Sequence, residues 1–208
     1  MVGSLTFYFD FASPYAYVAF DETVKICKAA KINLVLRPVL VWAVLKAQGI
    51  SPPFQILARE TYMLPDMTRS AAFFGLPYAP PDPLAISAHR AARLWLALAG
   101  STDDKGVALA AAIYSARFAQ GFDITDERIL YDIATQFGYS GTVAVEQAHS
   151  EPTRLLLNES VASAVSDNAL GAPYFMLDGE GFFGADRLAQ IRWRLNLPPF
   201  DPCDRGIG

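Results

Sequence analysis

A strand that runs directly into a helix near the start of the chain does most to limit the possible folds. Residues 5–9 are apolar and aromatic, which predicts a buried strand, and residues 14–30 follow with a helical pattern. Residues 33–36 predict a short second strand that ends at Arg37-Pro38. A strand, a helix and a strand at this spacing predict a βαβ unit.

The middle of the chain has a different character, because it gives helical patterns without a strand signal. These helices are predicted at residues 43–48, 57–64, 87–99, 107–120, 126–137 and 143–149. The last part returns to α/β structure, with a helix at 151–165, strands at 173–177 and 181–183, and a helix at 186–195. We therefore expect an α/β domain made of residues 1–42 and 151–208, interrupted by a helical insertion domain at residues 43–150.

The composition argues against two classes of partner. The 208 residues carry a formal net charge of −4 and contain no run of lysine or arginine, which argues against a nucleic-acid partner. No apolar run approaches the roughly 20 residues that span a bilayer, and no signal core begins the chain. We therefore expect no membrane segment and a cytoplasmic protein.

Cysteine and histidine usage bears on disulfides and metals. Cys27 lies in a helical stretch and Cys203 in a proline-rich tail, so neither their spacing nor the expected compartment suggests a disulfide. His89 and His149 lie far apart, without a cluster of cysteines or carboxylates around either. The sequence therefore predicts no metal site.

The junction between the first strand and the first helix is where we expect chemistry. Ser13 is suited to cap the helix, and Pro14 is suited to its first turn. The unpaired amides and the positive end of the helix dipole would then converge on one small hydroxyl, which favours binding of an anion.

Two features near the C-terminus have both an ordinary and a functional interpretation. Pro173 stands at the first residue of a predicted strand, where it either ends a loop or follows a cis peptide bond that exposes neighbouring backbone groups. Asp186 follows Gly184-Ala185 at a predicted helix start, where an aspartate is either an N-cap or a ligand-binding group.

Taken together, three segments carry a resemblance to a known family: residues 9–17 (FDFASPYAY), residues 171–175 (GAPYF) and residues 178–188 (DGEGFFGADRL), with Arg37-Pro38-Val39-Leu40 and Pro52-Pro53 between them. In this order and spacing they resemble the 2-hydroxychromene-2-carboxylate isomerases, relatives of the kappa-class glutathione transferases and of DsbA-like proteins. The resemblance covers essentially the whole chain. It implies a thioredoxin-like fold with a large all-helical insertion, and we expect a homodimer.

The resemblance also implies roles for individual residues around glutathione. It implies that Ser13 faces the glutathione sulfur and that the Ala172-Pro173 backbone clamps the cysteinyl part. It further implies that Asp186, with the Ala185 amide, holds the γ-glutamyl end, and that Arg59 lies near the glycyl carboxylate.

The second substrate would bind beside the sulfur, and this part of the site departs from the family pattern. Phe11, Trp42 and Tyr62 are candidates for the second substrate's pocket, and each could equally belong to the core. Ile50 replaces an asparagine that is common in relatives, and Ser70 replaces a frequent tryptophan.

We therefore expect a glutathione-dependent isomerase that acts on an aromatic-ring degradation product with a conjugated keto-acid system. Two alternatives remain open: a glutathione transferase or peroxidase-type enzyme, and a ligand-binding protein without turnover. A thiol–disulfide oxidoreductase is rejected, because such relatives place Cys-x-x-Cys where this chain has Ser13-Pro14-Tyr15-Ala16.

Overall fold

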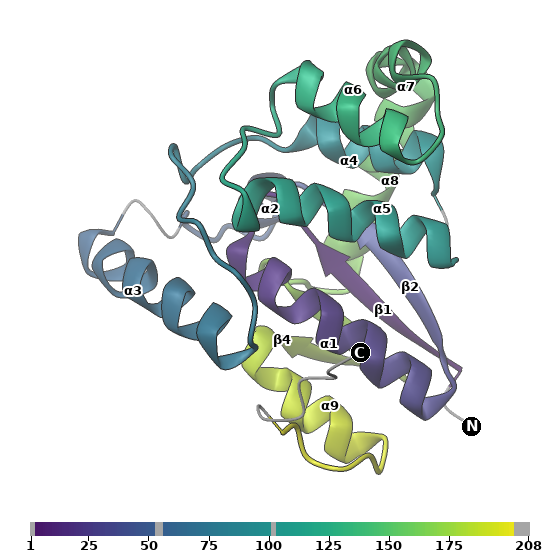
Figure 1. Cartoon of the computed structure of the whole chain (residues 1–208). Helices are drawn as coiled ribbons and strands as arrows, with labels where there is room; N and C mark the ends of the chain where they lie inside the picture. The colour runs from purple at the N-terminus through teal and green to yellow at the C-terminus, as the bar shows by residue number, and fades with distance from the viewer. Residues whose placement is uncertain (1–2, 53–55, 101–102, 202–208) are drawn as a thin grey trace.

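A four-stranded sheet lies at the centre of the computed structural model, which describes residues 3–52, 56–100 and 103–201 (Figure 1). The strands are β1 (Ser4–Phe9), β2 (Asn33–Pro38), β3 (Tyr174–Leu177) and β4 (Glu180–Phe183), in the order β2-β1-β3-β4. β1 pairs with β2 in parallel and with β3 in antiparallel, and β3 pairs with β4 in antiparallel. The helix α1 (Pro14–Ala30) joins β1 to β2, which confirms the predicted βαβ unit.

The remaining helices are α2 (Val41–Ala47), α3 (Leu57–Phe73), α4 (His89–Leu98), α5 (Asp104–Tyr114), α6 (Glu127–Gln136), α7 (Gly141–His149), α8 (Glu151–Ser166) and α9 (Leu188–Arg194). In Figure 1, α4, α6 and α7 gather at one end of the molecule, whereas α3 lies apart from them beside α1. The described residues therefore form a thioredoxin-like sheet with helices gathered at one of its ends.

The core follows from the alternation of side chains along β1. Leu5, Phe7 and Phe9 share the face that α1 covers, and Phe7 stacks on Phe175 of β3 with ring centroids 4.8 Å apart. Tyr8 points to the opposite face, where it packs in a smaller cluster with residues of α2 and α8. Both faces of β1 are thus covered, which explains why apolar and aromatic residues predominate on both of its faces.

The main core continues from the sheet into the central helices. The ring of Phe9 lies 6.0 Å from that of Trp95 on α4 and 6.0 Å from that of Tyr114 on α5, and all three side chains are fully buried. The expected division into residues 1–42 with 151–208 and residues 43–150 stays a prediction, and one packed core joins the two parts.

Two central helices differ from the sequence-based expectation. The sequence predicts that a helix ends at residue 64, whereas α3 continues through Pro65 to Phe73. Proline removes one backbone donor from a helix. The turns beyond Pro65 bury Met67 and Ala71, and this packing compensates for the lost hydrogen bond. The predicted helix 107–120 begins earlier, at Asp104, and its last part, Ser115–Ala119, is a π-helical turn.

Three further properties concern the whole described chain. No helix within the described ranges is long and apolar enough to cross a membrane. Within the same ranges no group of three or more His, Cys, Asp or Glu side chains could hold a metal ion. Cys27 is buried, which raises the pKa of its thiol to about 12, while Cys203 lies outside the described residues.

Candidate functional site

Ser13 caps α1, as the sequence predicts. Its backbone is extended (φ −93°, ψ 112°), its Oγ accepts a hydrogen bond from Ala16 N at 3.2 Å, and Pro14 occupies the first turn. Its side chain is nearly buried at 7% exposure. The capped N-terminus of a long helix therefore carries a hydroxyl at its first turn, in a nearly dry environment.

The Ser13 hydroxyl also reaches a segment from the far end of the chain. Its Oγ donates a hydrogen bond to Ala172 O at 2.8 Å, and the Ala172–Pro173 peptide bond is cis. The pairing of β3 with β1 sets Tyr174 opposite Tyr8, which brings this loop beside the end of β1. Of the two interpretations of Pro173 that the sequence leaves open, the structure has the cis peptide bond.

Asp10 is a buried carboxyl that sequence reasoning missed. Its side chain is 2% exposed; Oδ1 accepts from Ala12 N at 2.9 Å and Oδ2 accepts from Val41 N at 2.8 Å. Burial raises the pKa of Asp10 to about 6, although both backbone hydrogen bonds act to lower it. A lone aspartate inside the aromatic run Phe9-Asp10-Phe11 was the available signal.

Asp10 joins two parts of the chain, because the two amides that donate to it belong to different elements. Ala12 belongs to the turn before α1, and Val41 is the first residue of α2. One carboxyl therefore fixes the Ser13 turn relative to the helix that carries Trp42 and Leu45.

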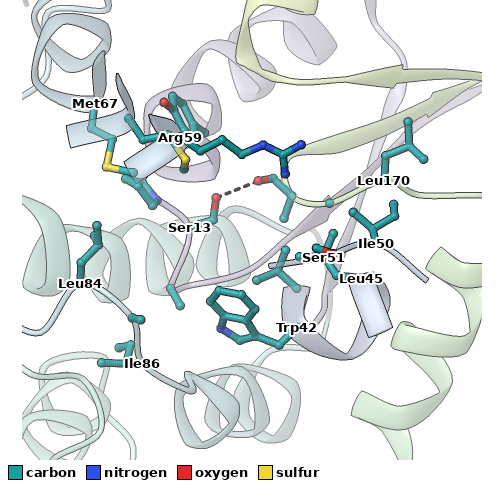
Figure 2. A pocket seen from close by; sticks show the side chains of 18 of the residues that line it. Ser13, Trp42, Leu45, Ile50, Ser51, Arg59, Met67, Leu84, Ile86 and Leu170 are labelled. Carbon is teal, nitrogen blue, oxygen red and sulfur yellow. Dashed lines mark hydrogen bonds between the residues drawn. The ribbon is translucent and has the colours of Figure 1, made fainter. Parts of the chain in front are cut away.

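A cavity of about 480 Å³ opens beside Ser13 (Figure 2). Its walls come from the turn before α1, from α2, from α3, from residues 84–86, from residues 170–172 and from Phe183. The lining is mainly apolar, with Trp42 on one side and Met63 and Met67 of α3 on another. A cavity of this size and character suits a small organic molecule with a large apolar part.

Arg59 is the one charged residue among the described residues that line this cavity. It lies in the first turn of α3, and in Figure 2 its side chain extends toward the Ser13–Ala172 hydrogen bond. No carboxylate of the described residues lies within ion-pair distance of it. An anionic ligand group in the cavity would therefore find a cation that is not already paired.

The structure brings several of the predicted residues together. Ser13, Trp42, Arg59 and Ala172 all line the cavity, and Pro173 is buried directly behind Ala172. Ile50, one of the two departures from the family pattern, lines it as well. Residues from both ends of the chain and from its middle thus meet at one place.

Two of the predicted pocket residues lie elsewhere. Phe11 is fully buried with its ring 5.1 Å from Phe9 and 5.0 Å from Tyr114, so it belongs to the core and does not line the cavity. Tyr62 is 62% exposed, is not a lining residue, and lies beneath the guanidinium of Arg69. An aromatic residue near a motif looks the same in sequence whether it faces a cavity, the core or solvent.

Ala185 and Asp186 lie outside the cavity wall. They begin the short turn Ala185–Arg187, whose N-cap is Gly184 and which has no side-chain capping bond, so Asp186 is not an N-cap. The Asp186 carboxylate is exposed and lies 3.3 Å from Arg187 Nη2. Gly184 N donates to Pro173 O at 3.1 Å, so this turn starts beside the cis-proline loop.

Comparisons with known proteins bear on the family and the fold of the chain. A family model described as DSBA-like thioredoxin domain matches residues 4–196. The chain is 28% identical to glutathione S-transferase kappa 1 of Caenorhabditis elegans, covering 93% of this chain and 91% of that protein. It is 26% identical to 2-hydroxychromene-2-carboxylate isomerase of Sphingobium xenophagum, covering 90% of this chain and 95% of that protein.

A solved structure of 2-hydroxychromene-2-carboxylate isomerase superposes with a TM-score of 0.83, over 93% of this chain and 94% of that one, at 20% sequence identity. At this identity the likeness concerns the fold. The helical block between β2 and β3 is therefore a shared feature of the fold.

Proposed function

The chain belongs to the DSBA-like thioredoxin domain family, and on that premise we propose that it is a glutathione-dependent enzyme in which Ser13 stabilises the glutathione thiolate. The observation that carries the proposal is the Ser13 hydroxyl, at the capped N-terminus of α1, on the wall of an apolar cavity. Within the part of the chain that the structure describes, no cysteine lines this cavity. A sulfur nucleophile would therefore have to arrive on a ligand.

The residues around Ser13 fit glutathione. Ala172 presents its backbone at the cavity wall, as the clamp for the cysteinyl part requires, and Arg59 offers a cation for a terminal carboxylate. Asp186 and the Ala185 amide, in the turn that starts beside the cis-proline loop, would receive the γ-glutamyl end. The bound tripeptide supplies a thiol whose ionised form is the nucleophile.

Ser13 would lower the pKa of that thiol through two contributions. A hydrogen bond from a hydroxyl to a charged group contributes about 1.5–3 kcal/mol, and a helix N-terminus contributes about 0.3–2 kcal/mol. At about 1.36 kcal/mol per pKa unit, the thiol pKa would fall by roughly one to four units. Ser13 itself is not the nucleophile in this proposal, because no histidine or carboxylate of the described residues lies within hydrogen-bond distance to take its proton.

The Ser13 hydroxyl would change partners when glutathione binds. A hydroxyl has one proton to donate, and Ser13 gives it to Ala172 O. When Oγ–H turns toward the sulfur, the Ala172 carbonyl becomes free to accept a backbone N–H of the cysteinyl part. One rotation therefore supplies both the anion-stabilising donor and the clamp.

For the reaction we propose isomerisation of an aromatic-ring degradation product that carries a conjugated keto acid, with glutathione regenerated. The apolar wall with Trp42 suits a flat aromatic body, and the likeness to the Sphingobium isomerase supports this choice. The second candidate is glutathione transfer, which the 28% identity to a kappa-class transferase favours.

The test has two arms. Calorimetric titration with glutathione, together with ultraviolet absorbance of the thiolate near neutral pH, is expected to give saturable binding and an ionised thiol. Incubation with 2-hydroxychromene-2-carboxylate should convert it while total glutathione stays constant. Thioether formation with 1-chloro-2,4-dinitrobenzene, and no conversion of the chromene, would favour the transferase. A folded protein that does not bind glutathione would contradict both candidates.

A further inference from the structure

One wall of the cavity is made by residues without regular secondary structure. Leu84, Ala85 and Ile86 line the cavity from the connection between α3 and α4. In Figure 2, Leu84 and Ile86 lie on the opposite side of the cavity from Ile50 and Leu170. The width left for a second substrate therefore depends on how firmly this connection is held.

Arg117 is the side chain that holds it. Arg117 is fully buried, and its Nη2 donates hydrogen bonds to Pro83 O and, at 3.4 Å, to Leu84 O. Its Nε and Nη1 have no hydrogen-bond partner among the described residues, and none of the ion pairs found there includes it. The two carbonyls of the connection are thus the polar partners of a buried cation.

The turn that carries Arg117 makes further contacts with the same connection. Arg117 lies in the π-helical turn Ser115–Ala119, a geometry that inserts an extra residue and is frequent at functional sites. The next residue, Phe118, accepts a hydrogen bond from Ala79 N at 2.6 Å, and its ring stacks on that of Tyr78 with centroids 6.2 Å apart. The connection is therefore attached to this turn at two places, residues 78–79 and residues 83–84.

A buried arginine with unpaired donors contributes little to the unfolding free energy of the protein. Removing a guanidinium from water has a desolvation penalty that carbonyl contacts repay only in part, so an apolar side chain of similar length is often neutral or stabilising there. The specific contribution of Arg117 is orientation, because its donors reach the backbone just before Leu84.

We propose that Arg117 is a positioning residue that fixes the wall formed by Leu84, Ala85 and Ile86, and so determines which second substrate fits beside Ser13. Arg117 lines no part of the cavity and touches no reacting atom. The statement about the second substrate rests on the proposed function, whereas the statement about the wall does not.

The test compares Arg117→Met with Arg192→Met. Arg192 is the control, because it forms a partly buried ion pair, with Glu22, but lies on α9 and lines no part of the cavity. Amide hydrogen exchange at Ala79, whose N–H donates to Phe118 O, should become about tenfold faster in Arg117→Met, because the connection then loses its attachment at Pro83 and Leu84. Tenfold is the lower end of what one hydrogen bond to a charged group contributes. Global stability in urea should stay level or rise, and Arg192→Met should leave exchange at Ala79 unchanged.

The kinetic arm uses the second substrate that the wild type converts, 2-hydroxychromene-2-carboxylate for an isomerase or 1-chloro-2,4-dinitrobenzene for a transferase. In Arg117→Met its KM should rise about tenfold, with kcat and the glutathione affinity within about twofold of the wild type, since only the wall is altered. In Arg117→Lys, which keeps the charge and one donor group, the KM should lie between those of Arg117→Met and the wild type. If Arg117→Met does not fold, Arg117→Lys is compared with the wild type in the same measurements.

The exchange arm needs no glutathione, so it decides the role of Arg117 even if the proposed function fails. Unchanged exchange at Ala79 in folded Arg117→Met would overturn the proposal. So would free exchange of this amide in the wild type. A loss of global stability equal in size to the local change would overturn it too, because Arg117 would then be a general structural residue.

Discussion

The Ser13 hydroxyl has one proton, two lone pairs and more potential partners than it can satisfy at once. It donates to Ala172 O and accepts from Ala16 N, which leaves one lone pair. The capping bond keeps Oγ at the helix terminus while the donated bond can be exchanged. In the proposed function, that division would let Ser13 remain a structural cap while its donated bond is transferred to the ligand.

Replacing this hydroxyl separates the two roles. In Ser13→Ala the thiol pKa of bound glutathione should rise by roughly one to two units, because a donor to a charged sulfur contributes about 1.5–3 kcal/mol. Glutathione affinity at a pH where the thiol is protonated should change much less. Ultraviolet titration of the enzyme–glutathione complex measures the pKa, and calorimetry measures the affinity.

Ser140→Ala is the matched control for this substitution. Ser140 caps α7 in the same way, with its Oγ accepting from Val143 N at 3.5 Å, and it lies away from the cavity. It should lose helix-cap stability, about 1 kcal/mol, without moving the thiol pKa. If Ser13→Ala also leaves that pKa unchanged, the serine is a cap alone.

The buried Asp10 carboxyl makes the unfolding free energy of the protein depend on pH. An aspartate carboxyl has an ordinary pKa of 3.8, and burial raises the pKa of Asp10 in the folded protein to about 6. Because the folded state holds this proton more tightly, the carboxyl contributes stability that is fully present below about pH 4 and is lost as the pH rises through about 6. Asp10→Asn removes that contribution, so the unfolding free energy of the variant relative to the wild type should increase by roughly 2–3 kcal/mol from pH 4 to pH 7.

Urea unfolding of both proteins at several pH values checks this sign. The asparagine keeps one acceptor for two amides, so the variant should be the less stable protein at pH 4. A difference between the two proteins that stays constant across the range would mean that Asp10 does not titrate there.

At the scale of elements, α3 shows where local rules and packing disagree. The sequence ends the helix before Pro65, since proline lacks a donor and crowds the preceding turn. In the structure the helix continues, because Met67 and Ala71 bury one side of its second half. The residues that line the cavity from α3, Arg59 and Met63 included, all depend on this helix for their positions.

Pro65→Ala should therefore stabilise the protein. Pro65 is exposed, and alanine restores the missing backbone hydrogen bond in the helix interior, so we expect a gain of roughly 1–3 kcal/mol in the unfolding free energy. Pro152→Ala is the control, because Pro152 lies in the first turn of α8, where the amide has no helical partner. Urea unfolding that gives equal effects for both substitutions would contradict the prediction.

At the scale of the whole molecule, sequence patterns predict helices and strands better than they predict the tertiary contacts between them. The βαβ unit, the Ser13 cap and the bounds of α1 follow from local residue patterns and are confirmed. The partners of Asp10 and the fates of Phe11 and Tyr62 depend on contacts between segments distant in the chain. Periodicity carries no information about those contacts, which is why the three residues had to be located in the structure.

The continuity of the core from the sheet into the helices predicts cooperative unfolding across the expected domain boundary. Phe9 on β1 packs on Trp95 and Tyr114. A substitution that destabilises either the sheet or the helices should therefore lower the stability of both. Leu130→Ala in α6, a buried site remote from the sheet, should lower the unfolding free energy by about 2–5 kcal/mol. Native-state hydrogen exchange should then show the same decrease in β1 and β2 as in α6 and α7. A decrease confined to the helices would mean that residues 43–150 unfold as a separate unit, with the Ser13 turn left intact.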